Sequence, residues 1–129
     1  MADHFNVLDR STALDVTFTQ TGTVTGTFTS TARWYAPYAC TVTAVRASLG
    51  TAPSVQAVKV DVQKNGTSIF ATTTANRPSV AVAGNTATGG TPDTVALVAG
   101  DYLTVSGTQG DTAGAAAVLT VQVTLSRSA

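Results

Sequence analysis

The sequence predicts an all-β protein, a single β-sandwich or jelly roll of about eight mostly antiparallel strands. Three observations support this fold class: a β-hairpin signature over residues 58–70, strict alternation of apolar and polar residues in other segments, and turn signals spaced by roughly ten residues. Thr, Val, Ala and Gly dominate the composition, and the β-branched Thr and Val fit a pleated surface better than a helix. No segment predicts a convincing helix.

The hairpin signature reads VKVDVQKNGTSIF. Its alternation places valines on one face of a strand and polar side chains on the other, namely Val58, Val60 and Val62 against Lys59, Asp61 and Gln63. Asn65-Gly66 then supplies the two residues with positive φ that a two-residue type I′ turn requires. We therefore expect two antiparallel strands with one dry face and one wet face.

Residues 12–30 alternate as strictly as the hairpin does. The even positions carry Val16, Phe18, Val24 and Phe28, and threonines fill the odd positions from 17 to 29. The pattern fits either a hairpin that turns near Thr21-Gly22 or one long strand bent at its glycines, and the unbroken parity across Gly22 favours the bent strand. The threonine row resembles an ice-binding array, but one row on one strand is too small for that activity.

Four further segments complete the predicted sandwich, over residues 41–49, 79–83, 102–105 and 118–125. The last is the clearest, because apolar Leu119, Val121 and Val123 alternate with polar residues. Cys40 is the single cysteine, so the chain cannot form an internal disulfide. The apolar neighbours of Cys40 predict a buried position in the core.

Residues 1–11 are predicted to form an N-terminal arm, and residues 12–129 the sandwich domain. The arm lacks strand alternation yet contains apolar Phe5, Val7 and Leu8, whereas a disordered tail is normally more polar. These three residues are candidate contacts to a neighbouring molecule; folding back onto the arm's own domain fits equally well. The arm does not resemble a signal peptide and no segment is apolar enough to span a membrane, so synthesis in a cytoplasm is expected.

The chain carries few charges and no charge cluster. Charged residues make up 11% of it, against roughly 25% in an average globular protein. Seven scattered basic residues balance seven aspartates, and the formal net charge is zero. Because nucleic acids and anionic membranes need a clustered positive field, we expect neither as a partner. A nearly uncharged surface of short side chains favours assembly with other protein copies.

The residue types that enzymes and metal sites need are nearly absent. His4 is the single histidine and lies in the predicted arm, and Glu, which paired-carboxylate glycosidases usually contain, does not occur. Asp93, Asp101 and Asp111 stand beside Gly, Pro or Thr, where an aspartate ordinarily accepts hydrogen bonds from turn amides. We therefore expect no enzymatic activity, no bound metal and no cofactor.

Trp34, Tyr35 and Tyr38 form an aromatic cluster around Pro37. Because proline cannot donate to a strand ladder, the cluster is expected at a sheet edge or a strand end. Two interpretations stay open: a ligand-binding surface of exposed rings, or a plug that packs on the core with its polar tips at the rim.

Several motifs occur in a fixed order along residues 34–125. They are ASLGTAPS at 47–54, the hairpin at 58–70, RPSV at 77–80, AGDYLTV at 99–105 and AVLTVQVTL at 117–125. Together they resemble a small β-sandwich module of virion proteins from tailed phages that infect actinobacteria. In that family the GTAP loop, the KNGTSIF hairpin and the AGDxLTV turn recur, and the family supplies no catalytic residues.

The resemblance implies a non-enzymatic virion protein with one of two tasks. Members occur at the ends of tail fibres, and similar small sandwiches act as capsid decoration proteins, commonly as trimers on the major capsid lattice. A stand-alone sandwich with its own arm fits the second task better, because a fibre tip normally follows a long shaft. We therefore expect a minor capsid protein at the capsid surface that stabilises the head. The alternative is a receptor- or glycan-binding module of the phage tail that uses the aromatic cluster.

Overall fold

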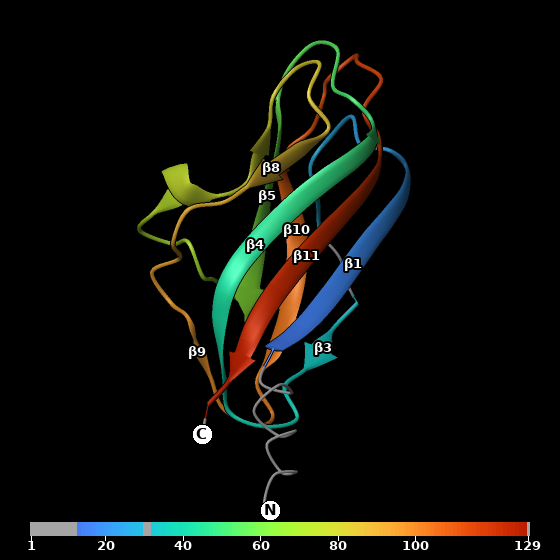
Figure 1. Cartoon of the computed structure of the whole chain (residues 1–129). Coiled ribbons are helices and arrows are strands. Elements are labelled where there is room, and N and C mark those ends of the chain that lie inside the picture. Colours follow the sequence, from blue (N-terminus) through green and yellow to red (C-terminus); the bar gives the residue numbers. More distant parts are fainter. Residues whose placement is uncertain (1–12, 30–31, 129) are drawn as a thin grey trace, which may run out of the picture.

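The computed structural model describes residues 13–29 and 32–128, which form two antiparallel sheets packed face to face (Figure 1). In sheet A the strand order is β1 (Ala13–Thr23), β11 (Ala117–Arg127), β4 (Cys40–Thr51) and β8 (Thr86–Thr88), with β9 (Ala96–Leu97) also paired to β4. In sheet B the order is β2 (Phe28–Thr29), β10 (Tyr102–Gln109), β5 (Val58–Lys64) and β6 (Thr67–Ser68), with β3 (Trp34–Tyr35) paired to β10 and β7 (Ser79–Val80) to β5.

The prediction of an all-β sandwich is confirmed. Every strand pairing within the described residues is antiparallel. Eleven strands occur there instead of about eight, because many of the pairings join strands of only two or three residues. The described chain also contains one short 3₁₀ turn, η2 (Thr74–Asn76). None of its helical segments has the length and hydropathy needed to cross a bilayer.

The core lies between the two sheets and consists mainly of valine and leucine. The alternation predicted for the last strand is confirmed, since its four alternating apolar side chains from Leu119 to Leu125 are at most 1% exposed. The strands β11 and β5 together contribute Leu119, Val121, Val123, Leu125, Val58, Val60 and Val62. Removing each such side chain from water contributes about 1.5–3 kcal/mol, which makes this core the main source of stability.

A β-bulge in β4 changes which residues face the core. Val42 pairs with Leu125 and Ala44 pairs with Thr124, so Thr43 is an extra residue without a partner across the ladder. Val42 and Val45 are consequently both buried although their positions have opposite parity. Alternation over residues 41–49 alone could not predict this switch. The Thr43 hydroxyl donates to the Thr124 carbonyl over 3.1 Å and stabilises the bulge.

The segment from β1 to β2 passes from one sheet to the other. β1 pairs with β11 in sheet A, whereas β2 pairs with β10 in sheet B, so the hairpin interpretation of residues 12–30 is wrong. The predicted parity holds, because Val16 and Val24 are buried and the intervening threonines are exposed. The register shifts between Gln20 and Thr23, and Gly22 has a φ of +86°. The bent-strand interpretation is therefore closer to the structure, and the bend lies where the chain passes from sheet A to sheet B.

The predicted hairpin and its turn are confirmed. Gln63 pairs with Ser68 and Lys64 with Thr67, and Asn65 and Gly66 both have positive φ, at 51° and 88°. The prediction that the polar side chains of the first strand face water is wrong at Asp61, which is only 3% exposed. Its carboxylate accepts hydrogen bonds from the Val62 amide, the Ser68 hydroxyl and the Gln63 side chain, and it pairs with Arg77 at 3.3 Å.

We expect Gly66→Ala to destabilise the protein by about 1–2 kcal/mol, because a side chain in the left-handed region places its Cβ against the following carbonyl. A Cβ there would meet nothing closer than the Tyr102 hydroxyl at 4.0 Å, so the cost arises from the backbone alone. Urea denaturation measures it. Gly26→Ala is the matched control, because a Cβ there meets nothing within 4 Å and its φ is not in the left-handed region, and it should leave the midpoint nearly unchanged. An unchanged midpoint for Gly66→Ala would show that the turn adopts another type at no cost.

Candidate functional site

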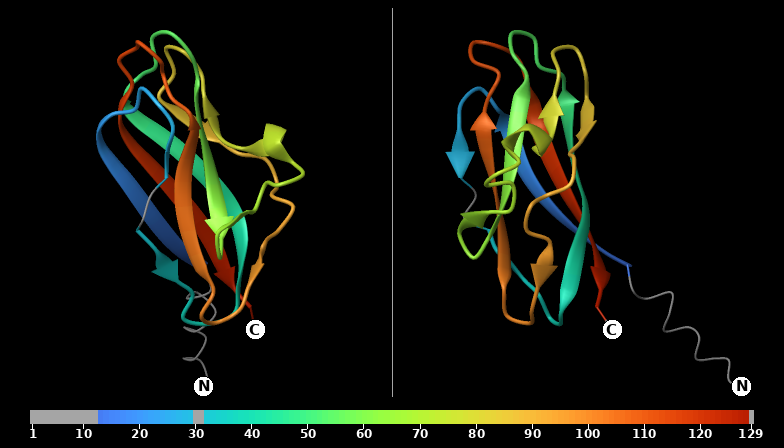
Figure 2. Two further views of the ribbon diagram at one scale, coloured as in Figure 1. Left: turned by 180° about the vertical axis from the view of Figure 1, so that it is seen from behind. Right: turned by 90° about the vertical axis from the view of Figure 1, so that its left-hand side faces the viewer.

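The two ends of the sandwich differ in their chemistry. One end, here called the loop end, consists of residues 21–27, 50–57, 81–85 and 110–118, and Figure 2 shows these loops gathered opposite the end at which β11 finishes. Asp111 is the one charged residue among them, and it is completely buried. The loop end therefore presents no charged side chain to solvent.

The Asp111 carboxylate joins two of these loops. It accepts hydrogen bonds of 2.8–3.1 Å from five backbone amides, those of Ser54, Val55, Gln56, Ala115 and Ala116. Burial by itself would raise the pKa of Asp111, but the amides of Ser54, Gln56, Val55 and Ala116 together outweigh it and hold that pKa well below the usual range. The local sequence predicts a turn aspartate, yet three of the five donors lie more than fifty residues away.

Backbone hydrogen bonds hold the remaining loops in place. The Ala83 amide donates to the Pro53 carbonyl over 2.9 Å. The Val24 carbonyl accepts from the Asp111 amide, and the Val24 amide donates to the Ala116 carbonyl. All four loops are thus tied to at least one other loop of the same end, which gives the surface a defined shape.

The surface that these loops present is uncharged, and exposed valines lie on it among exposed threonines. The described chain exposes five large apolar or aromatic side chains, and three of them, Val55, Val82 and Val118, lie at the loop end with exposures of 45–58%. Ala83, Ala113 and Val118 also have positive φ, which is rare for residues other than glycine and unusual for a β-branched valine. Strained backbone of this kind persists only where surrounding contacts maintain it, and it is commonly found at functional surfaces.

The opposite end, here called the charged end, contains charged and aromatic side chains: Arg33, Tyr35, Tyr38, Lys64, Asp101, Tyr102 and Arg127. Lys64 pairs with Asp101 at 3.6 Å, and Asp101 also accepts from the Asn65 side chain and the Val98 amide. The hydrogen bond from Asn65, followed by the one from Val98, holds the pKa of Asp101 below its usual range. All three tyrosines of the chain belong to this end.

The three aromatic residues singled out by sequence do not share one surface. Neighbouring residues of a strand point to opposite faces, so Trp34 packs against the core while Tyr35 is 55% exposed. Tyr38 packs against the core from another position, with the Arg127 guanidinium 4.3 Å from its ring centre. The plug interpretation therefore fits Trp34 and Tyr38, and the exposed-ring interpretation fits Tyr35.

Tyr35 has a partner that sequence reasoning did not identify. Tyr102 lies directly opposite it in the β3–β10 pairing, with ring centres 5.5 Å apart and planes inclined by 49°. The Arg33 guanidinium carbon lies 4.2 Å from the Tyr102 ring centre, and Arg33 Nη1 donates to the Tyr35 hydroxyl over 3.3 Å. The only signal in the sequence was that Tyr102 follows a predicted turn and begins a strand.

The outer face of sheet A is polar and nearly uncharged. The pairing register aligns Thr17, Gln122, Arg46 and Thr88 in one row across β1, β11, β4 and β8. In the adjacent row the Thr124 hydroxyl donates to the Asp15 carboxylate over 2.7 Å. A hollow on this face offers one cation and one anion, and it is lined by Asp15, Ala44, Arg46, Thr88, Gln122 and Thr124.

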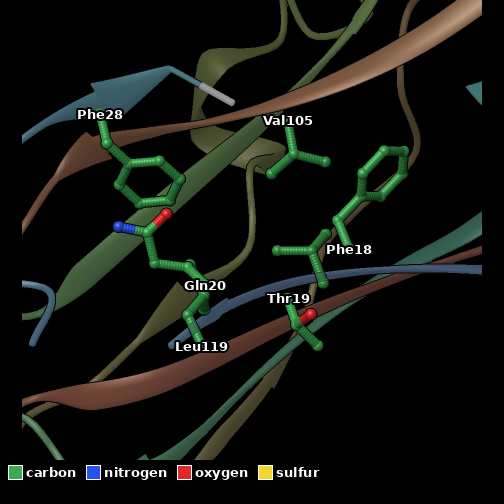
Figure 3. A pocket seen from close by; sticks show the side chains of 7 residues that line it. Phe18, Thr19, Gln20, Phe28, Val105 and Leu119 are labelled. Atoms are coloured by element: carbon green, nitrogen blue, oxygen red, sulfur yellow. The ribbon is translucent and has the colours of Figure 1, made fainter. Parts of the chain in front are cut away.

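A narrow apolar gap opens between the sheets at the edge formed by β1 and β2 (Figure 3). Phe18 and Gln20 border it from β1, and Phe28 borders it from β2, with Val105 and Leu119 beneath. Figure 3 shows the Gln20 amide beside the Phe28 ring. No titratable group lines the gap, so it offers hydrophobic contact and no acid–base chemistry.

The other predicted site residues fall into two groups. His4 and the proposed contacts Phe5, Val7 and Leu8 lie outside the described residues. Cys40 is buried as predicted, and burial raises the pKa of its thiol. Within residues 13–29 and 32–128, no three His, Cys, Asp or Glu side chains gather as they would around a metal ion.

Comparison with known proteins gives similarities of fold. No protein-family model and no curated protein matches the chain. A chain of the cyanophage Pam1 capsid is 19% identical, with a TM-score of 0.46 over 91% of this chain and 83% of that chain. The Drosophila NLP core is 11% identical, with a TM-score of 0.46, and the match covers 91% of this chain and 99% of that chain. The carbohydrate-binding module CBM36 is 12% identical, with a TM-score of 0.38, and the match covers 88% of this chain and 76% of that chain. Similarities this distant assign no function.

Proposed function

We propose that this chain is a non-enzymatic structural protein of a phage virion, a decoration or minor capsid protein that binds the major capsid lattice as a homotrimer and stabilises the head. The observation that carries the proposal is the loop end, an uncharged surface with three exposed valines on a backbone held in place by Asp111. The motifs that resemble those of virion proteins from actinobacterial phages support a virion protein.

The loop end has the properties that a docking surface needs. Exposed apolar patches on soluble proteins commonly mark interaction sites. Because no charge is exposed there, docking removes no ion from water, which would otherwise oppose binding. Loops already held by Asp111 lose little conformational freedom when they bind. Occupation of many equivalent lattice sites by linked copies then turns weak single contacts into stable bracing.

We expect Val82→Asp to lower occupancy of purified capsid shells at least tenfold, because the substitution places a charge within the apolar contact. Val98→Asp is the control, since Val98 is also an exposed valine but belongs to the turn that precedes Asp101 at the charged end. Shell co-sedimentation with quantitative mass spectrometry measures occupancy, and circular dichroism verifies the fold of both variants. Equal occupancy by Val82→Asp and the unmodified protein would contradict docking through the loop end.

Two further measurements test the finer parts of the proposal. Removal of residues 1–11 should leave a folded sandwich with reduced shell occupancy, as expected from Phe5, Val7 and Leu8. Light scattering should give a trimer in solution or after release from the shell. Equal occupancy without the arm, or a monomer in both places, would overturn these parts.

The copy number per virion separates this proposal from its alternative, a receptor- or glycan-binding module of the tail. Enough copies to occupy the capsid lattice would support the decoration protein. A number that matches only the tail would support the alternative.

A further inference from the structure

We propose that the charged end holds a binding site for an acidic saccharide, in which Tyr35 stacks on a sugar ring and Arg33 pairs with the sugar's carboxylate. The site lies at the end of the sandwich opposite the loop end, and it does not depend on the proposed structural role. A chain docked through its loop end would present this site to the surroundings.

Tyr35 provides the stacking surface. It projects from β3, which pairs along the edge of β10, and 55% of its surface is exposed. The inclined Tyr102 ring supports it from the opposite position of the ladder. Strand pairing places the two tyrosines opposite each other, and the contact with Tyr102 together with the hydrogen bond from Arg33 orients the exposed ring without a ligand. The apolar face of a sugar ring packs on an aromatic ring held in this way.

Arg33 provides the charge recognition. Its guanidinium lies over Tyr102 at 4.2 Å and donates to the Tyr35 hydroxyl, so it is oriented beside the stacking ring. That arrangement leaves further N–H donors of the guanidinium for a ligand. Of the ion pairs between described residues, one joins Lys64 to Asp101 and the other joins Arg77 to Asp61, and neither uses Arg33. A guanidinium with free donors binds a carboxylate through two parallel hydrogen bonds.

The charge balance of this end favours an anionic ligand. Asp101 is occupied by Lys64, Asn65 and the Val98 amide. Arg33 and Arg127 are each placed over a tyrosine ring and not beside a carboxylate of the described chain. A neutral sugar would use only the stacking surface, and an acidic peptide only the arginine. An acidic saccharide uses both.

The test is titration with trigalacturonate and, as its neutral counterpart, galactotriose, followed by amide chemical shifts in NMR spectra. We expect saturable binding of trigalacturonate, centred on residues 33–35 and 101–102, with galactotriose at least tenfold weaker. Tyr35→Ala should abolish binding of both. Arg33→Gln should remove the preference between the two ligands and leave weak stacking.

Two controls decide the outcome. Arg46→Gln removes an exposed arginine from the outer face of sheet A and should leave binding unchanged. Triglutamate carries carboxylates without sugar rings and should bind at least tenfold more weakly than trigalacturonate. The proposal is overturned if neither saccharide binds at about 10 mM, if Tyr35→Ala binds normally, or if triglutamate binds as well. None of these results would alter shell occupancy, so they are distinguishable from failure of the proposed structural role.

Discussion

Asp111→Ala is expected to lower the melting temperature by at least ~10 °C, more than any other single exchange of a polar residue in the described chain. The substitution leaves five backbone amides without their shared acceptor, in a place from which water is excluded. The loops that they belong to would separate, and the loop end would lose its shape. Differential scanning calorimetry measures the change.

Two comparison variants separate the Asp111 contacts from a general effect of losing an aspartate. Asp111→Asn retains one carbonyl acceptor and should destabilise less than alanine. Asp15→Ala removes an exposed aspartate that accepts a hydrogen bond from the Thr124 hydroxyl, and it should have a small effect. If Asp111→Ala and Asp15→Ala melted at the same temperature, the carboxylate would not be joining the loops.

The same carboxylate should make stability depend on acid. Because its pKa is lower in the folded protein than in the unfolded chain, its contribution is fully present above the ordinary aspartate pKa of about 3.9. The contribution is lost as the pH falls below that value toward the lowered pKa of the folded state. Urea midpoints between pH 6 and pH 2 should therefore fall more steeply for the unmodified protein than for Asp111→Asn. Parallel profiles would contradict the lowered pKa.

Gly110→Ala is expected to cost about 3 kcal/mol, through a backbone collision at the loop end. A Cβ at residue 110 would meet the backbone nitrogen of Gly26 and lie 2.5 Å from the Gly26 carbonyl oxygen. Because the obstructing atoms are backbone atoms, no flexible side chain can move aside, and the two loops themselves must separate. Urea denaturation at neutral pH measures the loss.

The same exchange at the contacting glycine supplies the control. Gly26→Ala places a methyl group where nothing lies within 4 Å, and its φ is not in the left-handed region. We expect its effect to stay within about 0.5 kcal/mol. Similar losses for both variants would show that the two glycines are needed for chain flexibility, and not because residue 110 approaches the backbone of residue 26.

The fold class and the local elements could be predicted from the sequence because the information is local. The type I′ turn follows from Asn65-Gly66, since few residue pairs adopt positive φ at both positions. The buried face of β11 follows from alternation, because a strand turns every second side chain to the same side. Neither inference requires knowledge of what the strand packs against.

The tertiary structure alone decided which distant residues meet, and the candidate surfaces depend on those meetings. Asp61 is buried because Ser68 and Arg77 reach over its strand, whereas alternation placed it in water. Tyr35 gains Tyr102 from a strand nearly seventy residues later. Asp111 takes most of its donors from a loop more than fifty residues earlier. Local periodicity says which way a side chain points, but the pairing of strands and the closure of loops determine what it touches.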